Sequence, residues 1–155
     1  GGDYNIFDIV PKHCKKLKIQ NPVISKHDLD KIKNLRSLNL SSNQINDLGK
    51  LEFPGQLKYL ELQQNSIAEL PDGLFKSKQL EFLNVSQNNI KEISAKVKGL
   101  KNVVSMNLAD NQLSDLPAEF SQLKNLKTLI LTGNPIEKST IEKLKTMMPQ
   151  TQIYF

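Results

Sequence analysis

The stretch Leu80–Ile93 reads LEFLNVSQNNIKEI, and it joins strand-forming apolar residues to an asparagine-rich run that disfavours a strand. The same pattern recurs as LRSLNLSSNQINDL from Leu35, LKYLELQQNSIAEL from Leu57, VVSMNLADNQLSDL from Val103 and LKTLILTGNPIEKS from Leu126. One asparagine keeps its place in each copy, at Asn43, Asn65, Asn88, Asn111 and Asn134, with spacings of 22, 23, 23 and 23 residues. A fixed period of this length predicts a stacked array of structural repeats.

The five copies follow the order L-x-x-L-x-L-x-x-N-x-L and therefore resemble the leucine-rich repeat family. The resemblance implies an α/β solenoid, curved into an arc, with a parallel sheet of about seven short strands on its concave face. Irregular or short helical segments are expected on the convex face. We predict one domain over residues 1–155, divided into an N-terminal cap (1–13), a degenerate first repeat (14–34), five regular repeats (35–136) and a C-terminal capping helix with a closing strand (137–155).

The degenerate first repeat is found by extending the pattern backward. Leu17 and Ile19 lie 21 residues before Leu38 and Leu40, and Cys14 takes the first apolar position. Cys14 is therefore expected to be a small buried apolar residue, with a reactive thiol as the alternative.

The C-terminal segment carries the signals of a helix. Ser139 with Glu142 three residues later resembles a capping box, and Ile141, Leu144 and Met147 recur at helical spacing. The final TQIYF then repeats the alternation of the earlier strands and is expected to close the sheet.

The segments between the strands are expected to bury apolar residues behind the sheet. These residues are Leu74, Phe75, Val97, Leu100, Phe120 and Leu123. The family resemblance also implies that the five repeated asparagines lie inside the arc and bond backbone groups of their own and neighbouring turns. Asparagine suits this place because its amide carries both donors and an acceptor. A metal or catalytic site built from these neutral amides is the weaker alternative.

Composition and motifs argue against an enzyme, a cofactor or a membrane span. One cysteine excludes an internal disulfide, and with only two histidines the chain lacks a zinc-type ligand cluster. There is no Gly-rich phosphate loop and no G-x-S-x-G turn. No apolar run approaches the roughly 20 residues of a membrane helix. We therefore expect no catalytic residues, no cofactor and no transmembrane segment.

The strand residues between the inward apolar positions should point to the concave face, because side chains alternate along a strand. The third position of each unit gives Lys16, Ser37, Tyr59, Phe82, Ser105, Thr128 and Gln152. The fifth position gives Lys18, Asn39, Glu61, Asn84, Asn107, Ile130 and Tyr154. From these two columns we predict a partner-binding set that comprises Asn39, Tyr59, Glu61, Phe82, Asn84, Asn107, Ile130 and Tyr154. The alternative for Tyr59 and Phe82 is a cross-strand pair that stabilises the sheet.

These features predict a non-catalytic module, expected to be a monomer, that binds a protein or peptide through its concave face. The alternative is nucleic-acid or anionic-surface binding, because residues 1–36 hold eight Lys or Arg against four acidic residues. The basic residues of that alternative are Lys12, Lys15, Lys16, Lys18 and Arg36. The composition and the PQTQIYF ending resemble small bacterial surface members of the family, so a bacterial cell-surface or secreted location is expected, with a cytoplasmic one as the alternative.

Overall fold

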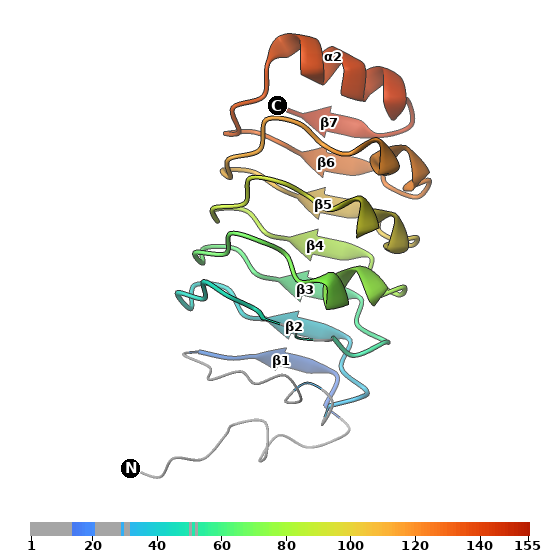
Figure 1. Ribbon diagram of the computed structural model, residues 1–155. Coiled ribbons are helices and arrows are strands. Elements are labelled where there is room, and N and C mark those ends of the chain that lie inside the picture. The colour runs from blue at the N-terminus through green and yellow to red at the C-terminus, as the bar shows by residue number, and fades with distance from the viewer. Residues whose placement is uncertain (1–13, 21–28, 30–31, 50, 52) are drawn as a thin grey trace.

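The computed structural model describes residues 14–20, 29, 32–49, 51 and 53–155. Within these residues, seven three-residue strands form one parallel sheet in the order of the chain. The strands are β1 (Lys16–Lys18), β2 (Ser37–Asn39), β3 (Tyr59–Glu61), β4 (Phe82–Asn84), β5 (Ser105–Asn107), β6 (Thr128–Ile130) and β7 (Gln152–Tyr154). Figure 1 shows them as a stack of arrows along the solenoid. The predicted α/β repeat fold, with its seven parallel strands, is confirmed.

The core lies directly behind the sheet, because the middle residue of each strand points inward. These middle residues are buried in β2 to β7 and half-buried in β1. They are Leu17, Leu38, Leu60, Leu83, Met106, Leu129 and Ile153. The first and third residues of every strand must then face the opposite side of the sheet.

The connecting segments supply the other wall of the core. Three short 3-10 helices, η2 (Asp72–Lys76), η3 (Ala95–Gly99) and η4 (Ala118–Gln122), stack on one side of the strands (Figure 1). Pro71 and Pro117 precede η2 and η4, where a missing N–H costs no helical hydrogen bond. The predicted burial behind the sheet is confirmed for Leu74, Phe75, Val97, Leu100, Phe120 and Leu123.

The C-terminal helix, α2 (Lys138–Met147), is present as predicted, but its predicted capping box is wrong. Glu137 is the N-cap and makes no side-chain capping bond, while Ser139 already lies in the first turn. Ile141 N–H donates to Glu137 O at 3.1 Å, so the helical hydrogen bonds begin at Glu137. Ser139 therefore lies inside the helix and not at its N-cap. Burial of Ile141 and Leu144 against the last repeat fixes this phase. Neither α2 nor the three short helices have the length and apolar content that spanning a bilayer demands.

The first repeat is described only in part. β1 pairs with β2 in register, and Ile19 is buried as expected. Cys14 is half-buried, so its predicted burial holds only in part, and its Sγ donates to Lys16 O at 3.1 Å. The predicted cap over residues 1–13 lies outside the described residues.

Each repeated asparagine joins its own turn to the turn before it. The Asn88 Nδ2 donates at 3.0 Å to Leu62 O of the preceding repeat and at 3.0 Å to Val85 O of its own. Its Oδ1 accepts from Ile67 N–H at 2.9 Å. The other four repeated asparagines also donate to one carbonyl of the preceding repeat and to one of their own. These are Asn43, Asn65, Asn111 and Asn134. One side chain thus satisfies backbone groups of two successive turns, which would otherwise be buried without partners.

The residue before each of these asparagines adopts a left-handed backbone conformation. The φ angles are 58° at Ser42, 58° at Gln64, 55° at Gln87, 56° at Asp110 and 78° at Gly133. A non-glycine residue pays roughly 1–2 kcal/mol for this conformation. This left-handed corner of the chain nevertheless lets the backbone bond to the next repeat, because Gln87 N–H donates to Ala109 O at 2.9 Å.

Replacing Asn88 by alanine should lower the free energy of unfolding by about 1–3 kcal/mol, because its backbone partners stay buried without a hydrogen bond. Urea denaturation measures this change. The matched control is Asn89→Ala, since Asn89 is exposed beside the buried Asn88, and it should change stability by less than about 0.5 kcal/mol. Equal effects of the two substitutions would contradict the structural role of Asn88.

The corner conformation predicts an order of stability at Gln87. Gln87→Val should destabilise the chain by about 1–2 kcal/mol, because a β-branched residue is strained at positive φ. Gln87→Gly should be more stable than the Val variant by a similar margin, since glycine carries no such strain. Thermal melting of both variants measures the order, with Asn89→Val as the control at a residue without positive φ. A Val variant as stable as the Gly variant would refute the corner geometry.

Candidate binding surface on the concave sheet face

The strand register places two columns of side chains on the face of the sheet opposite the core. The first residues of β1 to β7 pair with one another in succession, and so do the third residues. Neighbouring strands lie about 4.8 Å apart, so each column is a closely spaced row. Both columns contain the residues predicted from the repeat pattern, including all eight of the predicted partner-binding set.

Tyr59 and Phe82 form a stacked aromatic pair in the first column. Their ring centroids lie 5.0 Å apart with an interplanar angle of 9°. The two residues are 44% and 40% exposed, although their strands are central in the sheet. The pair therefore contributes to sheet packing, as cross-strand aromatics do, and still presents a broad apolar surface to solvent.

Three asparagines of the second column have a structural task of their own. Asn39 Oδ1 accepts from Ser41 N–H at 2.9 Å, and Asn84 Oδ1 accepts from Ser86 N–H at 3.0 Å. Asn107 Oδ1 accepts in the same way from the N–H two residues further on, at 3.0 Å. These bonds close Asx-type turns at the strand ends. The amide Nδ2 groups are the part of these side chains that the turns do not use.

The predicted set divides into residues that lie together and residues that lie apart. A concavity of about 650 Å³ is lined by Tyr59, Glu61, Phe82, Asn84, Asn107 and Ile130, together with Lys16, Ser37 and Ser105. Asn39 and Tyr154 do not line it. Tyr154 lies on β7 and is 51% exposed beside Phe155, whose ring lies 4.5 Å from Lys145 Nζ. The aromatic pair and the C-terminal tyrosine are thus separate surfaces.

The basic residues of the alternative hypothesis gather at one end of the sheet. Lys15, Lys16 and Lys18 are exposed in and beside β1, and Lys12 lies outside the described residues. Arg36 is half-buried, and its Nη1 donates to Gln56 Oε1. Lys16 belongs to the concavity of the aromatic pair, so this basic end adjoins the candidate surface.

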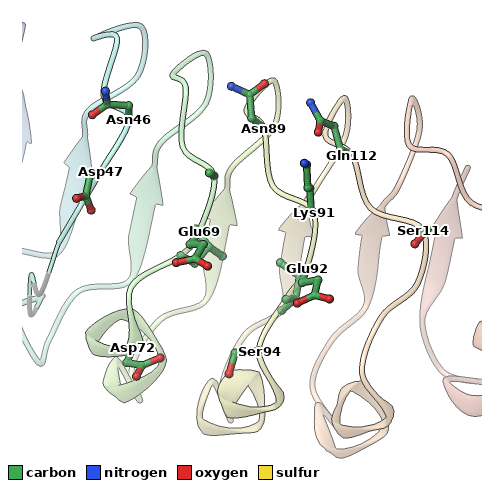
Figure 2. A pocket seen from close by; sticks show the side chains of 13 residues that line it. Asn46, Asp47, Glu69, Asp72, Asn89, Lys91, Glu92, Ser94, Gln112 and Ser114 are labelled. Carbon is green, nitrogen blue, oxygen red and sulfur yellow. The ribbon is translucent and has the colours of Figure 1, made fainter.

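A larger concavity of about 970 Å³ lies on the segments that follow the asparagine turns. We call this surface, which includes Asp47, Glu69 and Glu92, the acidic flank. Figure 2 shows Glu69 and Glu92 on successive segments, with Asp72 at the start of η2 and Ser94 just before η3. Its lining is mainly polar and contains no aromatic residue. We favour the smaller concavity as a binding surface, because exposed aromatic area contributes more to association than solvated charges do.

Sequence reasoning missed this acidic flank, although a repeated signal was present. An acidic residue follows four of the repeated asparagines by four positions, at Asp47, Glu69, Glu92 and Asp115. The pKa of Asp115 is lowered, chiefly by the hydrogen bond from Leu116 N–H at 2.8 Å; desolvation opposes this effect, and Lys143 adds to the lowering. Lys143 Nζ lies 3.2 Å from Asp115 Oδ2 and so ties α2 to the flank. Among the described residues, no group of His, Cys, Asp and Glu is arranged to hold a metal ion.

Comparison with known proteins agrees with the repeat geometry. A leucine-rich repeat protein from Leptospira interrogans is 30% identical, with a TM-score of 0.71 over 87% of this chain and 41% of that one. An internalin from Listeria monocytogenes is 26% identical, with a TM-score of 0.72 over 90% of this chain and 39% of that one. A chain of the Toll–Spätzle complex of Drosophila is 22% identical, with a TM-score of 0.71 over 81% and 18%, and shares the fold alone.

This chain therefore spans about two fifths of the length of the first two relatives. None of the curated proteins matches it. The family model described as a leucine-rich repeat region matches residues 13–149, which is most of the chain. The repeat period, the asparagine bonds and this match agree: the chain belongs to the leucine-rich repeat family.

Proposed function

We propose that this chain is a non-catalytic interaction module that binds a protein or peptide partner through its concave sheet face. The observation that carries the proposal is the stacked pair of Tyr59 and Phe82, which stays 44% and 40% exposed at the centre of the sheet. Aromatic residues in the middle of a surface are the usual anchors of protein interfaces. If the two rings served only to stabilise the sheet, burying them would stabilise it more than leaving them exposed does.

The surroundings of the pair fit an interface rather than a small-molecule pocket. The concavity is open along the sheet and combines the two rings with Ile130, Glu61 and the asparagine amides. An apolar centre with polar groups around it is the usual anatomy of a protein interface. Small ligands, in contrast, are usually enclosed on most of their surface. Leucine-rich repeat relatives offer a precedent for this class of function, since the Toll–Spätzle complex is a protein–protein assembly that contains the same fold.

Replacing Tyr59 and Phe82 together by alanine should weaken partner binding at least about 30-fold, because two buried aromatic anchors typically contribute 2 kcal/mol or more. The partner is captured on the immobilised wild-type chain from the source organism, and its Kd is measured for both forms. The loss of the stacked pair should lower stability by only up to about 1 kcal/mol.

The control replaces Lys98 and Lys101, which are exposed on the convex side, by alanine, and it should retain wild-type affinity. Melting temperatures of all three forms separate lost binding from lost folding. Unchanged affinity in the aromatic variant, with a lowered melting temperature, would show that the pair serves the sheet alone and would refute the proposal.

A further inference from the structure

The concave face holds one carboxylate, and the chain itself does little to satisfy it. The two columns of β1 to β7, which the structure describes completely, contain the charged residues Lys16, Lys18 and Glu61. Glu61 is half-buried and accepts one hydrogen bond, from Gln63 Nε2 at 3.4 Å, which is at the outer limit for such a bond. None of the ion pairs among the described residues includes Glu61. A carboxylate can accept about four hydrogen bonds, so most of its capacity is unused.

Glu61 lies where a partner on the aromatic pair would exclude water. Tyr59 and Glu61 are two residues apart on the same face of β3, or about 7 Å along the strand. Both line the concavity that also contains Phe82. A carboxylate that loses its water without gaining a counter-charge costs several kcal/mol. A partner that covers Tyr59 and Phe82 must therefore bring hydrogen-bond donors to Glu61, and a cationic side chain supplies these together with the counter-charge.

The shape beside Tyr59 indicates which cation fits. Each ring of the stack uses one face for the other ring, and Tyr59 is flanked in register by Ser37 on β2. Serine is too small to cover the outer face of the Tyr59 ring, and Ser37 and Tyr59 both line the concavity, so this ring face borders open space. Glu61 is diagonal to this space across the β2–β3 pair. A planar group placed there would contact the ring and reach the carboxylate together.

A guanidinium group meets both requirements. It stacks on aromatic faces and binds a carboxylate through two parallel hydrogen bonds, whereas a lysine ammonium offers a point charge without the flat surface. Lys16 borders the same space from β1. Because Lys16 is exposed, screening by the solvent weakens its repulsion of a second cation.

We propose that the partner places an arginine side chain over Ser37, against the outer face of Tyr59, with its guanidinium bonded to the Glu61 carboxylate. This inference rests on the proposed function, because it presupposes a protein or peptide on the concave face. It adds the chemistry of the recognised segment, which is an arginine next to an apolar residue that covers Phe82.

A random peptide library displayed on phage tests the inference directly, because the selected peptides themselves reveal the preferred side chains. Selections run in parallel on the wild-type chain, on Glu61→Gln and on the Tyr59→Ala, Phe82→Ala double variant. The wild type should enrich peptides that pair an arginine with an apolar residue. Glu61→Gln should still enrich the apolar residue but lose the arginine. A synthetic wild-type-selected peptide should bind Glu61→Gln at least about tenfold more weakly, and the same peptide with lysine in place of arginine should also bind the wild type more weakly.

The remaining outcomes separate the two proposals. Peptides that lack a basic residue and depend on Tyr59 and Phe82 would overturn the arginine inference and leave the proposed function standing. Arginine enrichment that persists on Glu61→Gln would also overturn it, since the cation would then be bound elsewhere. Selection that yields nothing, or peptides that bind the double variant as well as the wild type, would overturn both. Circular dichroism melting of each variant verifies that it is folded.

Discussion

The structure depends on one constraint, which is that a chain turning inside a core must find partners for its backbone groups. In each repeat the strand lasts three residues before the chain leaves the sheet at a buried corner. The asparagine side-chain amide supplies these hydrogen-bond partners from inside the core. Asn88 is 6% exposed and bonds carbonyl groups of its own repeat and of the preceding one. Because each repeated asparagine bonds both its own repeat and the preceding one, the asparagines hold the repeats at one constant spacing.

That constant spacing also places the residues of the proposed binding surface side by side. With no shift between successive strands, the first and third residues of all strands form straight columns. The apolar and asparagine positions are committed to the core, so the column positions are free to carry other chemistry. Tyr59, Phe82 and Glu61 are brought together in this way from β3 and β4, and none of the three takes part in the asparagine bonds. Folding and the proposed recognition therefore use different residues of the same short strands.

Most of the fold could be predicted from the sequence, because the period fixes which side chains point inward. The strand positions and the columns follow from the alternation, and the burial of Phe75 and Phe120 follows from the apolar residues of the connecting segments. The left-handed corner could not be read from the repeats, since Gly133 is the only glycine among the five residues that adopt it before a repeated asparagine. The residue at which α2 begins could not be predicted from local sequence signals either, because burial of Ile141 outweighs the capping preference of Ser139.

The position of the candidate surface could be predicted from the sequence, but the interactions of its individual side chains could not. The alternation identifies Asn84 as a concave-face residue, yet only the structure shows its oxygen engaged by Ser86 N–H. The stacking of Tyr59 on Phe82 and the sparse bonding of Glu61 likewise depend on side-chain placement.

The central claim is that recognition takes place on this face, and NMR mapping tests it most directly. Backbone amide shifts of the isotope-labelled chain are recorded as the isolated partner is added. The account predicts that the largest changes fall on β3, β4 and β5 and on the ring signals of Tyr59 and Phe82. Changes confined to the acidic flank around Glu69 and Glu92, with the aromatic signals unmoved, would contradict it.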